Sequence, residues 1–326
     1  MACKKLNFSF PLSGRRGVRG EALFTFFFSF FLFTLSLSAQ QAIPVWPNGK
    51  KPNNNGFAVS DTIKEERIWT VANPTLYCFP ATKEKNTGTA VLICPGGGYV
   101  RLPDMRQKYA LANWFAENGI NAYVLISRLP NQQDLIEPQI AALQDAQRAI
   151  KIIRANAKQW NLNPEKVGVM GTSAGGHVAS LLSTREKDYS NIGDVLDTFS
   201  HRPNFQVLMS PVITMGAYAH KGSKISLLGA DTANAEKVHL YSNETQVTKF
   251  TPPTFLIHAF NDRAVPVQNS LLFYNALVEN NIVSSIHIFP QGGHAIGVAN
   301  NPGSTEMWKP LLLAWLQEIG IYTPKQ

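Results

Sequence analysis

The chain has 326 residues, of which 44% are hydrophobic and 16% are charged, and its formal net charge is +8 at pH 7. This composition excludes an intrinsically disordered chain, and the length allows one large domain or two ordinary ones. No stretch after residue 40 is dense in lysine and arginine and interleaved with aromatic residues, so nucleic acid is not expected as a partner.

Residues 1–39 have the layout of a secretory signal peptide. Five basic residues precede the apolar run Ala22–Leu37, which ends at the small residues Ser38 and Ala39. We expect cleavage after Ala39 and a secreted or periplasmic mature chain. A retained membrane anchor is the alternative, but the apolar run is shorter than the ~20 residues that a spanning helix needs. The leader holds five of the 30 basic and one of the 22 acidic residues, so the net charge of the mature chain is +4. Once the leader is cleaved, no stable membrane insertion is expected.

The mature chain divides into an arm and one domain. Residues 40–63 are rich in proline, asparagine and glycine, which predicts an extended arm without its own core. Residues 64–326 alternate between two kinds of segment and are expected to form a single domain. Apolar runs predict strands at Ile68–Val71, Leu76–Phe79, Ala90–Cys94, Ala122–Ser127, Val167–Met170, Phe205–Met209, Thr254–His258 and Ser285–Phe289. Apolar residues at intervals of three and four predict helices at Met105–Asn118, Pro138–Gln159, Ala174–Thr184, Gln268–Glu279 and Ser304–Ile319.

Strands that alternate with helices predict the α/β class. Because several strands are apolar on both faces, we expect a mostly parallel, eight-stranded sheet with helices on both faces. The first two strands have no helix between them, which favours an antiparallel hairpin at the N-terminal edge. The segment Val212–Phe250 interrupts the alternation and follows a strand, so it is expected to lie over the C-terminal edge of the sheet, where lids that shape substrate sites occur.

Ser173 is the first candidate for chemistry. It stands in Gly171-Thr172-Ser173-Ala174-Gly175, between an apolar run and a helical segment. A strand-turn-helix with glycine on both sides is the context of a nucleophile elbow, where the serine has strained backbone angles and the glycines allow strand and helix to approach closely. This motif is common in unrelated turns, and the surrounding strand and helix favour the functional interpretation here.

A glycine-rich loop follows an earlier strand. Gly96-Gly97-Gly98 comes directly after Ala90–Cys94 and Pro95. Such a loop can be a flexible turn or a phosphate cradle, but neither a Gly-Lys-Ser/Thr continuation nor dinucleotide-binding spacing follows it. In a serine hydrolase this loop supplies oxyanion-hole donors, so we expect the N–H groups of Gly97 and Gly98 to act together with that of Ala174.

A serine nucleophile needs a base and an acid that orients it. His294 lies in a glycine-rich loop just after the last strand, and Asp262 lies just after the strand before it. Their order, serine then aspartate then histidine, matches a hydrolase triad and favours the catalytic interpretation over a solvated loop histidine and a turn or helix-capping aspartate. Asp231, in the 212–250 segment, is a weaker rival for the acid.

The other histidines and the cysteines are given structural roles. We expect His177 to pack beneath the elbow, His258 to be buried in its strand, and His201, His220, His239 and His287 to lie on the surface or in loops. No pair has the spacing of metal ligands, so neither a metal nor another cofactor is implied. Cys78 and Cys94 are expected to be buried free thiols rather than a disulfide, and Asp145 and Arg148 to form a surface salt bridge.

Several motifs together resemble one known family. They are Pro95-Gly96-Gly97-Gly98-Tyr99, Gly171-Thr172-Ser173-Ala174-Gly175-Gly176-His177, Tyr241-Ser242-Asn243-Glu244, Thr251-Pro252-Pro253-Thr254-Phe255 and Gly292-Gly293-His294. From about Val45 onward the chain is similar to the bacterial α/β-hydrolases related to acetylxylan esterases. Asn261-Asp262 departs from the family pattern, in which two acids often stand at these positions.

The resemblance implies a triad of Ser173, Asp262 and His294 and an oxyanion hole at Gly97, Gly98 and Ala174. It also implies an acylated oligo- or polysaccharide as substrate, in the typical case O-acetyl groups on xylan or related plant polysaccharides. Two alternatives remain at this point: a serine peptidase similar to prolyl oligopeptidase, although no propeller-sized domain precedes the core, and a non-catalytic carbohydrate-binding module on the same fold.

Overall fold

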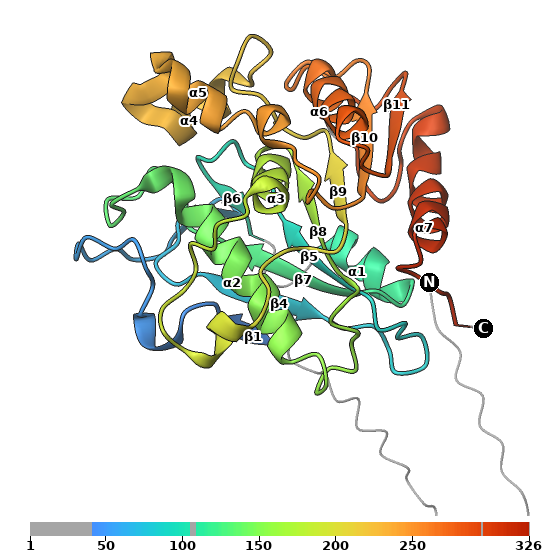
Figure 1. Cartoon of the computed structure of the whole chain (residues 1–326), viewed down its shortest axis with the longest axis horizontal. Coiled ribbons are helices and arrows are strands. Elements are labelled where there is room, and N and C mark those ends of the chain that lie inside the picture. The colour runs from blue at the N-terminus through green and yellow to red at the C-terminus, as the bar shows by residue number, and fades with distance from the viewer. Residues whose placement is uncertain (1–40, 105–108, 295, 326) are drawn as a thin grey trace, which may run out of the picture. The chain divides into compact units, whose positions relative to one another are not determined.

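A central sheet of eight strands organises the chain (Figure 1). The computed structural model describes residues 41–104, 109–294 and 296–325. The predicted signal peptide, residues 105–108 of the first predicted helix and Ala295 lie outside these ranges. In sheet order the strands are β1 (Ala42–Pro44), β4 (Thr75–Phe79), β7 (Asn121–Ile126), β5 (Ala90–Cys94), β8 (Val167–Thr172), β9 (Gln206–Met209), β10 (Thr254–Ala259) and β11 (Ser284–Phe289).

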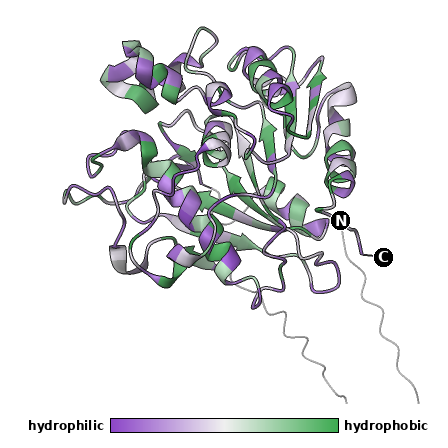
Figure 2. Cartoon of the chain, in the orientation of Figure 1, coloured by the Kyte–Doolittle hydropathy of each residue, from purple (hydrophilic) through white to green (hydrophobic). Residues whose placement is uncertain are grey.

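The sheet is parallel from β7 to β11, and β4 is antiparallel to both of its neighbours, β1 and β7. Every residue of β5 and of β7 is buried, because helices cover both faces of the sheet. Figure 2 shows these central strands as the most hydrophobic part of the described chain. The predicted α/β class and the mostly parallel sheet of eight strands are confirmed.

Five of the helices in the described ranges cover the two faces of the sheet. One hydrophobic cluster joins one face of the sheet to α1 (Ala110–Glu117) and α7 (Trp308–Glu318). A larger cluster joins the other face to α2 (Ala141–Ala155), α3 (Ala174–Thr184) and α6 (Gln268–Glu279). None of the described helices is long and apolar enough to cross a membrane.

The predicted N-terminal hairpin is wrong. The first predicted strand, β3 (Arg67–Thr70), belongs to a separate small sheet with β2 (Thr62–Lys64) and β6 (Leu102–Pro103). The N–H groups of Val71 and Ala72 donate to the side chains of Gln132 and Asp61, so the chain leaves β3 without turning back on it. The edge partner of β4 is instead β1, from the N-terminal arm.

The expected surface salt bridge between Asp145 and Arg148 is also wrong, because both side chains are buried and each has other partners. Asp145 accepts hydrogen bonds from the Arg128 guanidinium and from Trp46 Nε1. Arg148 pairs with Asp194 and Asp197. Residues 185–204 cover this side of α2, which explains how a helix with so many polar residues is buried.

The predicted buried thiols are confirmed. Cys78 and Cys94 are free and buried, and burial raises the pKa of each thiol to about 12. The 212–250 segment forms two short helices, α4 (Lys221–Leu228) and α5 (Ala235–Leu240), and short 3-10 turns around them.

Candidate active site

Ser173 lies at the turn between β8 and α3, at the C-terminal end of the parallel strands. Its φ of 55° and ψ of −125° are strained for a residue with a side chain. A Cβ on Gly171 would lie 2.1 Å from the carbonyl oxygen of Gly175, and one on Gly175 would lie 2.0 Å from that of Cys94. The expected elbow geometry is therefore present, and both glycines are required by the close packing of strand and helix.

The structure brings Ser173, His294 and Asp262 together from three separate loops. His294 Nε2 lies 2.8 Å from Ser173 Oγ, and Nδ1 of the same ring lies 2.7 Å from Asp262 Oδ2. The His294 side chain is 31% exposed, whereas that of Asp262 is fully buried. The rival acid, Asp231, lies in the 3-10 turn Gly229–Ala233 and is not among the described residues that line the cavity around Ser173.

Asp262 is held as a carboxylate. Burial raises its pKa, but the hydrogen bonds from His258, His294 and the Val265 N–H outweigh burial and hold the pKa well below its usual range. Oδ1 also accepts from the Ala264 N–H at 2.8 Å. A charged Asp262 fixes the tautomer of His294, because Nδ1–H then donates to the carboxylate and leaves Nε2 free to accept the Ser173 proton.

The glycine-rich loop lies beside Ser173. Gly97 and Gly98 line the same cavity, and both have positive φ, 139° and 67°. A Cβ on Gly97 would lie 1.7 Å from the Arg101 carbonyl oxygen. Across the described ranges, no protein acceptor pairs with the N–H groups of Gly97, Gly98 or Ala174, and Ala174 is the first residue of α3. These three N–H groups are therefore available to a negatively charged oxygen.

His177 packs beneath the elbow, as predicted, and links three of the motifs. Its Nδ1 accepts from the Tyr99 hydroxyl at 2.7 Å, and its Nε2–H donates to the Tyr241 carbonyl at 2.8 Å. Asn243 donates to the His177 carbonyl and to Ser180 Oγ. Burial lowers the pKa of His177 to about 4, so the ring is neutral and satisfied at both nitrogens.

Of the remaining histidines, His258 is buried in β10 as predicted, and His239 is exposed. His201 lies in a loop, as predicted, and is buried there because it packs against Asp188 in the segment that covers α2. His220 lies in a loop as predicted, but it also lines the cavity around Ser173, which the sequence did not indicate.

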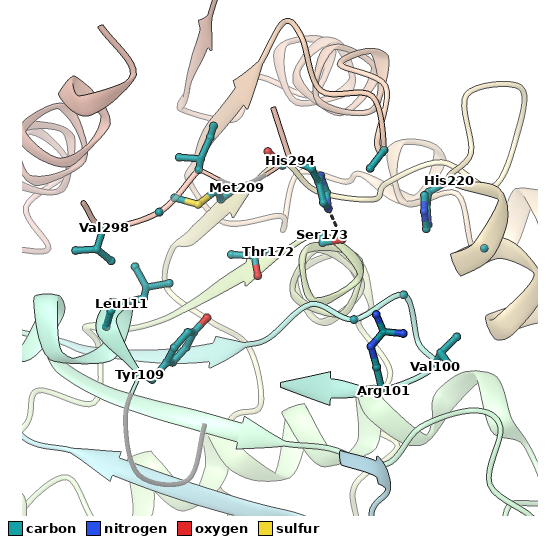
Figure 3. A pocket seen from close by; sticks show the side chains of 18 residues that line it. Val100, Arg101, Tyr109, Leu111, Thr172, Ser173, Met209, His220, His294 and Val298 are labelled. Carbon is teal, nitrogen blue, oxygen red and sulfur yellow. Dashed lines mark hydrogen bonds between the residues drawn. The ribbon is translucent and has the colours of Figure 1, made fainter. Parts of the chain in front are cut away.

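The cavity around Ser173 has a volume of about 620 Å³ (Figure 3). Its walls come from the glycine-rich loop, the start of α1, the ends of β8 and β9, the His294 loop and the start of α4. The start of α4 belongs to the 212–250 segment, so the expectation that this segment shapes the site is met at His220 and Gly222.

Comparison with known proteins shows to which family the chain belongs. The BD-FAE family model matches residues 76–277. An acetylxylan esterase of Xylanibacter ruminicola is 35% identical over 226 residues, which are 68% of this chain and 43% of that protein. Endo-1,4-beta-xylanase B of Butyrivibrio fibrisolvens is 37% identical over 211 residues, which are 65% of this chain and 33% of that protein. The chain thus spans less than half the length of either relative.

A solved structure matches nearly end to end. The acetyl ester-xyloside bifunctional hydrolase from Caldicellulosiruptor lactoaceticus is 34% identical, with a TM-score of 0.74 over 87% of this chain and 97% of that one. The carboxylesterase Cest-2923 from Lactobacillus plantarum, at 24% identity and a TM-score of 0.63, shares the fold. The resemblance drawn from the motifs is confirmed: the chain has the α/β-hydrolase fold and belongs to the BD-FAE family.

Proposed function

We propose that this chain is a serine esterase that removes acyl groups, above all O-acetyl groups, from xylan or a related plant polysaccharide. The observation that carries the proposal is the chain of hydrogen bonds from Asp262 through His294 to Ser173 Oγ. Ser173 lies in a cavity beside backbone N–H groups that no acceptor in the described part of the chain occupies. The relatives named for acetylxylan ester and xyloside hydrolysis support the substrate class.

The chemistry follows from the geometry. His294 Nε2 takes the proton of Ser173 as Oγ attacks the ester carbonyl carbon, and the Gly97, Gly98 and Ala174 N–H groups stabilise the negative oxygen of the tetrahedral intermediate. The imidazolium then protonates the departing sugar oxygen, which leaves an acyl group on Ser173. Water attacks this acyl-enzyme with His294 again as base, and the free acid leaves. The nucleophile, the base and the N–H donors of this cycle belong to the chain, and the second nucleophile is water.

The decisive experiment is Ser173→Ala. We expect kcat for p-nitrophenyl acetate to fall by about 10⁶-fold, the size of effect measured for a triad serine elsewhere, with the far-UV spectrum of the folded protein retained. The native chain should be labelled by a fluorophosphonate probe and the variant should not. Undiminished turnover by the variant, or a native chain that neither turns over nor labels, contradicts the proposal.

The natural ester is identified by a substrate screen. Acetylated xylan, acetylated pectin and feruloylated oligosaccharides are incubated with the protein, and released acetate and ferulate are measured. We expect acetate from xylan to be the main product. Activity on proline-containing peptides with none on these esters would favour a peptidase instead.

We further propose that residues 1–39 direct export and are removed after Ala39. N-terminal sequencing of the protein expressed with its full leader in a bacterial host tests this. The expected mature N-terminus is Gln40, in the periplasmic or culture fraction, and a cytosolic chain that begins at Met1 contradicts export.

A further inference from the structure

The cavity has two chemically different sides, with Ser173 between them (Figure 3). One side is mainly apolar and includes Tyr109, Leu111, Met209 and Val298 (Figure 3). On the other side, the side chains of Arg101 and His220 face the space. An acetyl group offers a methyl for apolar contact, whereas a sugar offers several hydroxyls that need hydrogen-bond partners. The apolar side therefore suits the acyl group, and the polar side suits the sugar that carries it.

His220 is held in one orientation by the start of α4. It is the N-cap residue of this helix, and the Ser223 N–H donates to its Nδ1 at 3.1 Å. Ser223 Oγ lies 2.8 Å from the same nitrogen. Because a backbone N–H can only donate, Nδ1 carries no proton, and the neutral ring must carry its proton on Nε2.

The neutral form is favoured by the surroundings. Burial, and after it the positive charge that His294 can carry, lowers the pKa of His220, and the carboxylate of Asp262 opposes them only in part. The ring packs against Gly222, where a Cβ would lie 3.2 Å from Cε1. In the ranges that the structure describes, no protein group accepts from Nε2. His220 thus presents a fixed Nε2–H donor on the polar side of the cavity.

Arg101 is a second donor on the same side. Its guanidinium lies over the Trp69 ring, 5.4 Å from the centroid, so an aromatic surface supports it from one side. The two side chains come from opposite walls, the glycine-rich loop and the 212–250 segment, and both lie across Ser173 from Tyr109 (Figure 3).

We propose that His220 determines specificity by donating a hydrogen bond from Nε2–H to an oxygen of the sugar that carries the ester. The proposal rests on the esterase function proposed above and adds a residue to it. His220 acts on sugar binding and on selection between alcohols, while proton transfer stays with His294.

Two substitutions separate this role from helix capping. In His220→Asn the amide oxygen replaces Nδ1 and keeps the cap, but no donor reaches the position of Nε2. In His220→Gln the amide nitrogen replaces Nε2, but the cap is lost. We expect kcat/KM for acetylated xylo-oligosaccharides, relative to that for p-nitrophenyl acetate, to fall about tenfold in the Asn variant, the size of one hydrogen bond, mainly through KM. The Gln variant should recover most of this ratio while melting at a lower temperature.

His239→Asn, on the exposed surface of α5, is the matched control and should leave the ratio unchanged. The proposal is wrong if the Asn variant retains the native ratio. It is also wrong if the ratio falls in whichever variant melts at the lower temperature, rather than in the variant that lacks a donor at the position of Nε2. Xylotriose binding to Ser173→Ala gives a readout that needs no turnover. We expect the additional His220→Asn change to weaken this binding about tenfold. Failure of the p-nitrophenyl acetate assay would instead overturn the esterase function itself.

Discussion

The Tyr99 hydroxyl donates to Nδ1 of His177 over 2.7 Å, with both side chains buried. This contact ties the loop that carries Gly97 and Gly98 to α3, the helix that follows Ser173. It runs on through His177 Nε2–H to the Tyr241 carbonyl in the 212–250 segment. Three motifs that are far apart in the sequence are therefore one hydrogen-bonded unit beneath the site.

Tyr99→Phe tests this unit. The substitution removes the donor and leaves His177 Nδ1 buried without a partner, so we expect the free energy of unfolding to fall by about 1–3 kcal/mol. Urea unfolding at pH 7 measures it. Tyr218→Phe, at a half-exposed tyrosine, is the control and should change the stability by less than about 0.5 kcal/mol. An equal loss in both variants would argue against the buried contact.

The low pKa of His177 predicts a pH dependence of stability. In the unfolded chain this histidine takes up a proton near its ordinary pKa of 6.5, whereas in the folded protein it stays neutral down to about pH 4. Stability should therefore fall as the pH drops from 6.5 toward 4, by up to about 3 kcal/mol from this residue. Urea unfolding at pH 7, 5.5 and 4.5 gives the slope, which should be shallower in His177→Gln. A slope that is the same in both proteins would assign the effect to other groups.

Asn261 has a role that the resemblance alone did not suggest. Its side-chain oxygen accepts the Gly293 N–H at 2.8 Å and so holds the loop beside His294. We expect Asn261→Ala to lower kcat about tenfold with little change in KM, because the base loses its fixed position. Asn261→Asp keeps an acceptor at this place and should restore most of the rate. A change in KM alone would contradict a positioning role.

The two loop glycines differ in what a methyl group would meet. At Gly97 a Cβ would collide with the Arg101 carbonyl, whereas a Cβ at Gly98 would have no atom of the described residues within 4 Å, apart from its chain neighbours. Gly97→Ala should therefore displace the loop and lower kcat by about 10²-fold or more, the cost of losing an oxyanion donor. Gly98→Ala should cost only the strain of its positive φ, about 1 kcal/mol of stability. Similar losses of kcat in both would show that crowding at Gly97 is not the cause.

Much of this architecture was predictable because the central strands are buried on both faces. Runs such as Ala90–Cys94 are apolar at every position, so they are easily recognised as strands. The helices α3 and α6 begin and end at the residues that the sequence indicated. The three residues of the proposed triad could be selected from the sequence because each stands in the loop that follows a strand, at the sheet edge where these loops converge.

The failures have physical reasons as well. β1 has three residues and ends in proline, which is too short for a pattern. Asp145 and Arg148 have the spacing of a surface pair, and only the tertiary structure shows that residues 185–204 and Trp46 cover them. His220 has no motif around it. Its one local signal is the spacing to Ser223, three residues on at the start of a helix, which is typical of a cap.

The shortness of β1 has a consequence for solubility. Without it, β4 would expose a row of unpaired N–H and C=O groups to which strands of other molecules could add. With β1 in place, the edge strand has only three residues, and Pro44 has no N–H group that could donate to an added strand. The Gln41 carbonyl already accepts from the Cys78 N–H, one residue beyond the expected mature N-terminus at Gln40. Trimming that removed a few more residues would thus turn a blocked edge into a template for aggregation.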